Sequence, residues 1–409
     1  MRIGYRRLLA ICSAGVVLAG VAGCGGEAKS SGSSSSGAIV LGASLPLSGS
    51  LGQTGIDLQA GYQQAVDEVN ADGGLTVDGE KREVTLEILD NRTDATTATQ
   101  QVRQLIDESG ATAILGSCTP TLVVPQALVA EQLQVPYVTS CNPVQSFTSG
   151  NEEGWKYSWD LFFDETAQAT AVADGLAQAD TNKKVALFTD TEPDGVAERT
   201  LYQAAFAEAG LTVVGDYTFP VGTTDFSSFI NDAKSAGAEI VVGQMIPPDG
   251  ITLWKQMKAL KFSPKVAFVS KAAANAEWTS ALAEIAEGTL TDGLWDLTAN
   301  PTASQEILDG PLGEKFSSSF ADLTIALLGY TVVQITADAI ESAGSTEAAA
   351  LNTAIGETNG DYALGTVTFD DQHTYATKYV LEQWQSDVMR QVIPSVDGAT
   401  LQVPAAGLQ

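Results

Sequence analysis

Basic residues, histidine and cysteine are all scarce in this chain of 409 residues. Lysine and arginine number 21 against 50 acidic residues, which gives a formal net charge of −29. Because such a surface repels phosphate backbones, the sequence excludes nucleic acid as a partner. One histidine and four cysteines leave too few ligands for a zinc site or for nucleophilic catalysis by a histidine-assisted serine or cysteine. We therefore expect no metal and no cofactor.

Two families of catalytic or phosphate-binding motif are also missing. The sequence contains no Gly-x-Ser-x-Gly nucleophile elbow, and no glycine-rich loop of the Walker or dinucleotide type. The glycines of GGLTVDG, residues 73–79, end a helical pattern and open a turn, which is the wrong context for phosphate binding. His373 lies in the polar stretch FDDQHTY, which we interpret as a surface turn. The chain is therefore expected not to be an enzyme.

The first residues have the pattern of a secretory signal. Three arginines precede an apolar run over residues 8–22 that is too short to span a bilayer. The following Val21-Ala22-Gly23-Cys24 resembles the lipobox of bacterial lipoproteins, which implies acylation of Cys24. The alternative is a plain signal peptide that is cut elsewhere. No later apolar stretch is expected to span a membrane.

A Ser/Gly-rich tract follows Cys24. Its composition cannot bury a core, so we predict a signal peptide over 1–23 and a flexible tether over 24–37. The folded part would then be extracytoplasmic, held by lipid at the outer face of the cell membrane.

From residue 38 onward, short β-rich runs alternate with amphipathic helical segments. AIVLGASLP is a predicted strand, and residues 55–70 are a predicted helix with its apolar residues on one face. The alternation continues to residue 140, and a second series begins at KVALFTD, residues 184–190. Two such series predict an α/β fold with two similar Rossmann-like lobes, each a parallel sheet covered by helices. Residues 321–344 are a long, mostly apolar predicted helix.

Ligands of open α/β sheets bind beyond the carboxyl ends of the strands. Cys118 and Cys141 each directly follow a predicted strand, so they are expected at the same edge of one sheet. In an oxidising compartment such a pair indicates a disulfide, and two free buried thiols are the alternative.

Four segments together resemble the solute-binding proteins of ABC importers of the branched-chain amino acid and amide class, which have the type I periplasmic-binding fold. They are residues 39–74, 114–140, 185–195 and 365–373. The resemblance implies two lobes joined by three hinge crossovers, a ligand buried between them and hinge closure on binding. The implied lobes comprise residues 38–158 with 288–366, and 159–287 with 367–409.

The resemblance also implies which residues contact the ligand. Cys118, Thr119 and Thr121 would hold a ligand carboxylate through amides and hydroxyls. The remaining positions that carry over lie on neighbouring loops and on the second lobe: Leu51, Cys141, Asn142, Asp194, Met245 and Ile246.

One position departs from the family pattern. Members that bind amino acids carry an acidic residue, the partner of the ligand ammonium, where this chain has Lys271. Unless Asp194 replaces that carboxylate, an α-amino group lacks a partner, and a lysine in the cleft favours an anionic group on the ligand. Alternatively, Lys271 points to solvent.

The expected function is capture of a small carboxylate-bearing molecule: a branched-chain or other amino acid, an amide, or an aromatic or dicarboxylic acid. The expected partners are an ABC permease with its ATPases and, through the lipid, the membrane, and the protein is expected to be a monomer. A ligand-sensing lipoprotein of the same fold that signals to a membrane receptor is the alternative.

Overall fold

The computed structural model describes residues 37–409. All described helices and strands lie in one compact unit, Ala38–Gln409, which therefore contains its own core. The predicted signal peptide, Cys24 and the tether up to residue 36 lie outside the described residues.

The first of two large sheets is parallel throughout. Its six strands, in spatial order, are β15 (Thr374–Thr377), β7 (Ser158–Phe163), β6 (Tyr137–Thr139), β5 (Ala113–Leu115), β1 (Ile39–Leu45) and β4 (Val84–Asp90). Helices cover both faces, so the central strands are short apolar runs that are almost wholly buried.

The second sheet has five parallel strands followed by two antiparallel ones. Its strands, in spatial order, are β9 (Thr212–Phe219), β8 (Lys184–Asp190), β10 (Ile240–Met245), β11 (Val266–Lys271), β12 (Leu290–Gly293), β16 (Val380–Gln385) and β17 (Val388–Ile393). Two small hairpins complete the strands: β2 (Leu75–Val77) with β3 (Glu80–Arg82), and β13 (Gly360–Tyr362) with β14 (Gly365–Val367). The predicted α/β class with two parallel-sheet lobes is confirmed.

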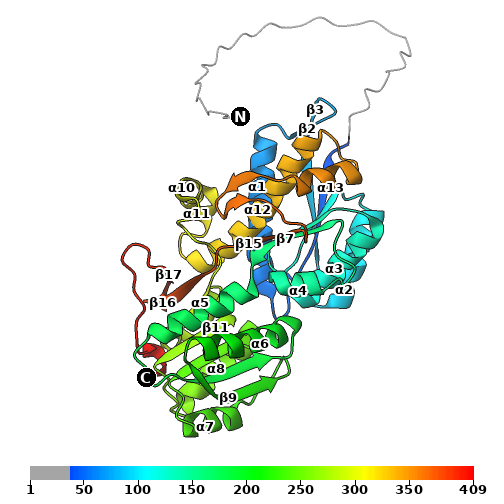
Figure 1. Ribbon diagram of the computed structural model, residues 1–409. Coiled ribbons are helices and arrows are strands. Elements are labelled where there is room, and N and C mark those ends of the chain that lie inside the picture. The colour runs from blue at the N-terminus through cyan, green and yellow to red at the C-terminus, as the bar shows by residue number, and fades with distance from the viewer. Residues whose placement is uncertain (1–36) are drawn as a thin grey trace, which may run out of the picture. The chain divides into compact units, whose positions relative to one another are not determined.

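Helices are distributed over the two sheets (Figure 1). Those that pack on the first sheet are α1 (Gly52–Ala71), α2 (Ala95–Asp107), α3 (Pro120–Leu133), α4 (Val144–Ser149) and α12 (Phe320–Ala343). Those on the side of the second sheet are α5 (Glu165–Gln178), α6 (Pro193–Glu208), α7 (Ser227–Ser235), α8 (Pro247–Ala259) and α9 (Glu277–Leu282). The remaining helices are α10 (Pro301–Asp309), α11 (Pro311–Lys315), α13 (Ala348–Gly356) and two short 3₁₀ segments, Ala283–Ala286 and Ala406–Leu408.

The chain passes between the two sheets three times, after β7, after β12 and after β15. Each passage falls later in the sequence than the lobe limits expected at residues 158, 287 and 366. Apolar strand residues explain the differences: Leu161 and Phe163 extend β7 into the first core, and Leu290 belongs to the second sheet. Residues 374–385 are divided between the sheets, since β15 joins the first sheet and β16 the second.

Helix α12 is long and apolar enough to cross a membrane by length and composition, which the sequence analysis did not expect. However, 89% of its most apolar window is buried inside the protein, so its composition reflects packing in the core. It lies beside α1 (Figure 1), and the contact is close because Gly61 has no side chain. A Cβ atom there would lie 1.8 Å from the carbonyl oxygen of Ala326.

Candidate functional site

A cavity of about 60 Å³ lies between the carboxyl ends of the strands of the two sheets. Residues on the side of the first sheet that line it are Leu51, Thr54, Cys118, Thr119, Pro120, Cys141, Pro143, Phe162, Phe163 and Ile325. Residues on the other side are Asp194, Glu198, Gln244, Pro247, Ser270, Lys271, Ala274, Asn275, Asp292 and Leu294. The first wall is apolar with a few hydroxyl groups, whereas the second carries the charged residues.

The first wall is built from the loops that follow β5 and β6. Cys118 and Cys141 lie in these loops, and the structure joins them by a disulfide with their Cα atoms 4.7 Å apart. The amide of Thr119 donates to the carbonyl oxygen of Cys141, 3.0 Å away. Thr119 has a φ of 71°, a sparsely populated conformation for a β-branched residue. Such backbone strain is typical of functional sites.

Proline at the first position of α3 fixes how this helix starts. Thr119 immediately precedes Pro120, the first residue of the helix, and its hydroxyl points across the cleft instead of capping the helix. The N-terminus of α3 therefore presents its positive dipole end toward the cavity.

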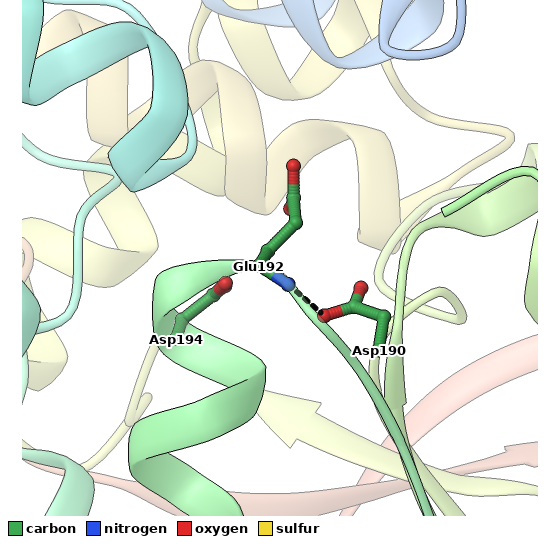
Figure 2. Close-up of side chains that lie close together, drawn as sticks. All are labelled: Asp190, Glu192 and Asp194. Atoms are coloured by element: carbon green, nitrogen blue, oxygen red, sulfur yellow. Dashed lines mark hydrogen bonds between the residues drawn. The ribbon is translucent and has the colours of Figure 1, made fainter. Parts of the chain in front are cut away.

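The second wall is built from the ends of β8 and β11. Asp190 ends β8, Glu192 precedes α6, and Asp194 lies in the first turn of α6. Figure 2 shows the three carboxylates close together, with the Glu192 amide donating to Asp190 at 3.0 Å and the Glu192 side chain pointing away from Asp190. Their oxygens lie within 4.8 Å of one another, and the ammonium of Lys271 is bound next to them.

Lys271 ends β11 and has a φ of 67°, so it is a second strained residue at the cavity. Its amide donates to Asp292 at 2.7 Å, which holds the backbone in place. Its Nζ donates to Glu192, and to Asp194 at 3.0 Å. The Lys271 side chain is 18% exposed and that of Asp194 only 4%. The alternative that Lys271 points to solvent is therefore wrong for this arrangement.

Direct hydrogen bonds connect the two walls. Lys271 Nζ donates to Thr119 Oγ1 at 2.9 Å, and the hydroxyls of Thr119 and Thr121 donate to Glu192 at 3.3 and 3.0 Å.

Two further hydrogen bonds connect the sides elsewhere in the cleft. Asn275 donates to Thr54 at 3.3 Å, and the amide of Ala276 donates to Asp322 at 2.7 Å. Polar contacts thus join the two walls at two places in the cleft, near Glu192 and near Asn275.

The electrostatics favour a charged Glu192–Lys271 pair. Burial acts to raise the pKa of Glu192, but Lys271 and the hydrogen bonds that Glu192 accepts lower it below the usual range. Burial likewise opposes the charged form of Lys271, yet Asp194, Glu192 and Asp190 raise the pKa of Lys271 well above its ordinary value. Both groups are therefore ionised at neutral pH.

Other carboxyl groups near this wall have raised pKa values. Burial raises the pKa of Asp190 to about 7 and the pKa of Glu198 far above its usual value. Burial also raises the pKa of Asp292, although hydrogen bonds from Tyr379 and from the Lys271 amide act against it. A neutral Glu198 limits the negative charge that the wall gathers around one lysine.

Six of the predicted ligand-binding residues line the cavity: Leu51, Cys118, Thr119, Cys141, Asp194 and Lys271. Thr121 lies outside the lining and contacts Glu192 across the cleft.

Three further predicted residues are buried in the protein and do not line the cavity: Asn142, Met245 and Ile246. Met245, for example, packs into the apolar core of the second half. The ligand-binding roles of all ten residues stay predictions.

Sequence reasoning missed Glu192. A usable signal exists, because a residue-proline pair follows three strands: Thr119-Pro120, Glu192-Pro193 and Ile246-Pro247. In each pair the proline is the first residue of a helix, so the preceding residue lies at the carboxyl end of the sheet. Glu192 is the charged member of this set.

Comparison with known proteins identifies relatives over most of the chain. The family model described as periplasmic binding protein matches residues 38–388. A Leu/Ile/Val-binding protein homolog of Brucella melitensis is 26% identical over 335 residues, which are 81% of this chain and 87% of that protein.

Solved structures have the same fold. A leucine-binding protein of Thermotoga maritima is similar with a TM-score of 0.77 and 25% identity, covering 86% of this chain and 97% of that one. A branched-chain amino acid binding protein of Streptococcus pneumoniae, in complex with isoleucine, has a TM-score of 0.73 and 21% identity. That match covers 90% of this chain and 100% of the other.

Proposed function

Because the chain belongs to the periplasmic binding protein family, whose model covers residues 38–388, we propose that it is the extracytoplasmic solute-binding component of an ABC importer. The relatives named above are solute-binding proteins and not enzymes, and their family works outside the cytoplasm. The proposed partners are a membrane permease and its cytoplasmic ATPases, to which the ligand is delivered.

The proposed ligand is a small molecule with a carboxylate. One observation carries this proposal: the hydroxyls of Thr119 and Thr121 and the ammonium of Lys271 converge on a carboxylate, that of Glu192. The two hydroxyls lie at the N-terminus of α3, where an anion is favoured, and the ammonium of Lys271 reaches Thr119 there from β11. An amino acid, an aromatic acid and a dicarboxylic acid all carry the group that this arrangement recognises.

The rest of the cavity favours an apolar ligand body. Phe162, Leu294 and Ile325 line it together with several prolines. A ligand with its carboxylate at the α3 end would bury its hydrocarbon part against these side chains.

Capture would work by hinge closure. The two sheets would form lobes that move about the three passages of the chain, and a ligand that contacts both walls would favour the closed state.

The predicted N-terminal features complete this proposal. Signal cleavage before Cys24 and its acylation would hold the protein at the membrane, and the tract 24–37 would let it move. In that oxidising compartment the Cys118–Cys141 bond would persist and keep the first wall in place.

A thermal-shift screen tests the proposed ligand class. The soluble chain from Ser30 onward is unfolded and refolded to remove any carried-over ligand. It is then screened with neutral and acidic amino acids, amides, aromatic carboxylates and dicarboxylates, since a ligand of the folded state raises the melting temperature. We expect a shift with at least one carboxylate. Shifts with amides alone would contradict the proposal.

A further inference from the structure

Glu192 uses up the hydrogen-bond donors that a ligand carboxylate would need. A lysine ammonium has three N–H donors, and those of Lys271 go to Thr119, Glu192 and Asp194. A threonine hydroxyl has one proton, and those of Thr119 and Thr121 both go to Glu192. Since every donor is engaged, a ligand carboxylate cannot bind these groups while Glu192 holds them.

Glu192 also comes from the opposite side of the cleft to its two hydroxyl partners. It precedes α6 on the second sheet, whereas Thr119 and Thr121 lie at the start of α3 on the first. Its side chain is 14% exposed and is not among the residues that line the cavity. A short movement outward would place it in water without passing through the core.

Replacing one carboxylate by another keeps the local charge unchanged. Lys271 would still face one carboxylate from Asp194 and one from the ligand, so the net charge around the lysine would be the same before and after the exchange. A ligand with only an ammonium group could not replace Glu192 as the acceptor of these hydrogen bonds, because an ammonium has donors and no acceptor.

We infer that Glu192 is a tethered competitor: its carboxylate occupies the position of the ligand's carboxylate, and the ligand must displace it. This inference rests on the proposed function and adds a residue that sets the selectivity of the site. Glu192 holds the lobes closed when no ligand is bound. The site therefore selects molecules whose carboxylate competes with an internal one, and rejects amines.

Closure of the ligand-free protein gives the first test. Small-angle X-ray scattering measures the radius of gyration of the refolded chain from Ser30 onward, as wild type, Glu192→Ala and Glu208→Ala. Glu208 is the exposed last residue of α6, the helix that Glu192 precedes, and serves as the control. We expect the Glu192→Ala protein to be larger than the other two, because its walls lose their connection. An unchanged radius of gyration would overturn the inference.

A second variant serves if Glu192→Ala does not fold. Thr121→Val changes an exposed side chain and removes one of the two hydroxyl partners of Glu192. It should increase the radius of gyration by a smaller amount. No change in this variant would count against the inference in the same way.

Ligand binding gives the second test: the loss of Glu192 should tighten carboxylate binding. This measurement also separates the inference from the proposed function. Isocaproate, which is leucine without its ammonium, and L-leucine are titrated into wild type and Glu192→Ala by calorimetry. If the closed form held by Glu192 makes up about nine-tenths of the ligand-free molecules, its loss tightens carboxylate binding about tenfold. Weaker binding by the variant would identify Glu192 as a latch that helps the ligand, and would overturn the inference. If neither protein binds any carboxylate while the radius still differs, the proposed function fails and the contact of Glu192 stands.

Discussion

The two walls of the cleft are held in place in different ways. The first wall, around Thr119, presents neutral donors on a helix N-terminus and is held by a disulfide. The second wall, around Lys271, presents full charges that hold one another in place. A disulfide fixes its loops under all non-reducing conditions, whereas a charge cluster depends on every member and on pH. The first wall should therefore tolerate substitutions near the cavity better than the second.

The largest expected effect is the loss of the lysine from the second wall. Lys271→Met leaves Glu192 and Asp194 without their cation in a mostly buried place. Removing one partner of a buried ion pair costs about 3–5 kcal/mol of unfolding free energy. Urea unfolding measures this cost.

A surface pair provides the matched control for this substitution. Lys265→Met breaks the pair of Lys265 with Glu239, whose side chains are 43% and 32% exposed. Such pairs contribute about 0–1 kcal/mol. Equal losses of unfolding free energy in the two variants would show that the ion pairs of the second wall stabilise the fold no more than a surface pair does.

Reduction of the disulfide should have the next largest effect. Cys118 and Cys141 are 23 residues apart, and closing a loop of this size in the unfolded chain is worth about 3 kcal/mol. Wild type should lose this amount of unfolding free energy in a reducing agent. The double variant Cys118→Ser, Cys141→Ser should be destabilised already and should not respond further. If the unfolding free energy of wild type is the same with and without reductant, the disulfide does not stabilise the first wall.

The smallest expected effect concerns the connection between the walls. Glu165 begins α5, directly after the first passage between the sheets, and accepts hydrogen bonds from Ser146 at 3.0 and 2.6 Å. Burial raises its pKa from 4.5 to about 7, although the Ser146 hydrogen bonds oppose the rise. The folded state then binds a proton more tightly than the unfolded state. Stability from this group is fully present below pH 4.5 and is lost as pH rises through about 7.

Melting temperature against pH measures this loss. Wild type should melt at lower temperature as pH rises across that window, and Glu165→Gln should show a shallower fall, since Asp57 and Glu382, with pKa values of about 8, still titrate. The exposed control Glu208→Gln should follow wild type. A Glu165→Gln curve parallel to that of wild type would contradict the assignment of this pH dependence to Glu165.

The sequence predicts the first wall better than the second for a physical reason. Strand ends, proline-initiated helices and a cysteine pair are local patterns, so Cys118, Thr119 and Cys141 could be placed at one edge of a sheet. Glu192, Asp194 and Lys271 meet only because β8 and β11 flank β10 in the folded sheet. Which carboxylate pairs with the lysine depends on side-chain directions that no local pattern encodes.

The last passage of the chain between the sheets could not be placed from the sequence for a similar reason. Residues 374–385 are one β-rich run, and neither composition nor periodicity marks the point where the chain leaves one sheet for the other. Tertiary contacts decide it: β15 pairs with β7, and Trp159 of β7 stacks on His373, with ring centroids 3.6 Å apart. The histidine that the sequence placed in a surface turn is half-buried by this contact.

A calorimetric comparison of matched acids and amines tests the central claim most directly. Refolded wild type is titrated with isocaproate, L-leucine, benzoate and succinate, and with isoamylamine and benzylamine, which lack the carboxylate. The account predicts binding among the carboxylates, weakened in Lys271→Met, and none by the two amines. Binding of an amine together with no binding of any carboxylate would contradict it.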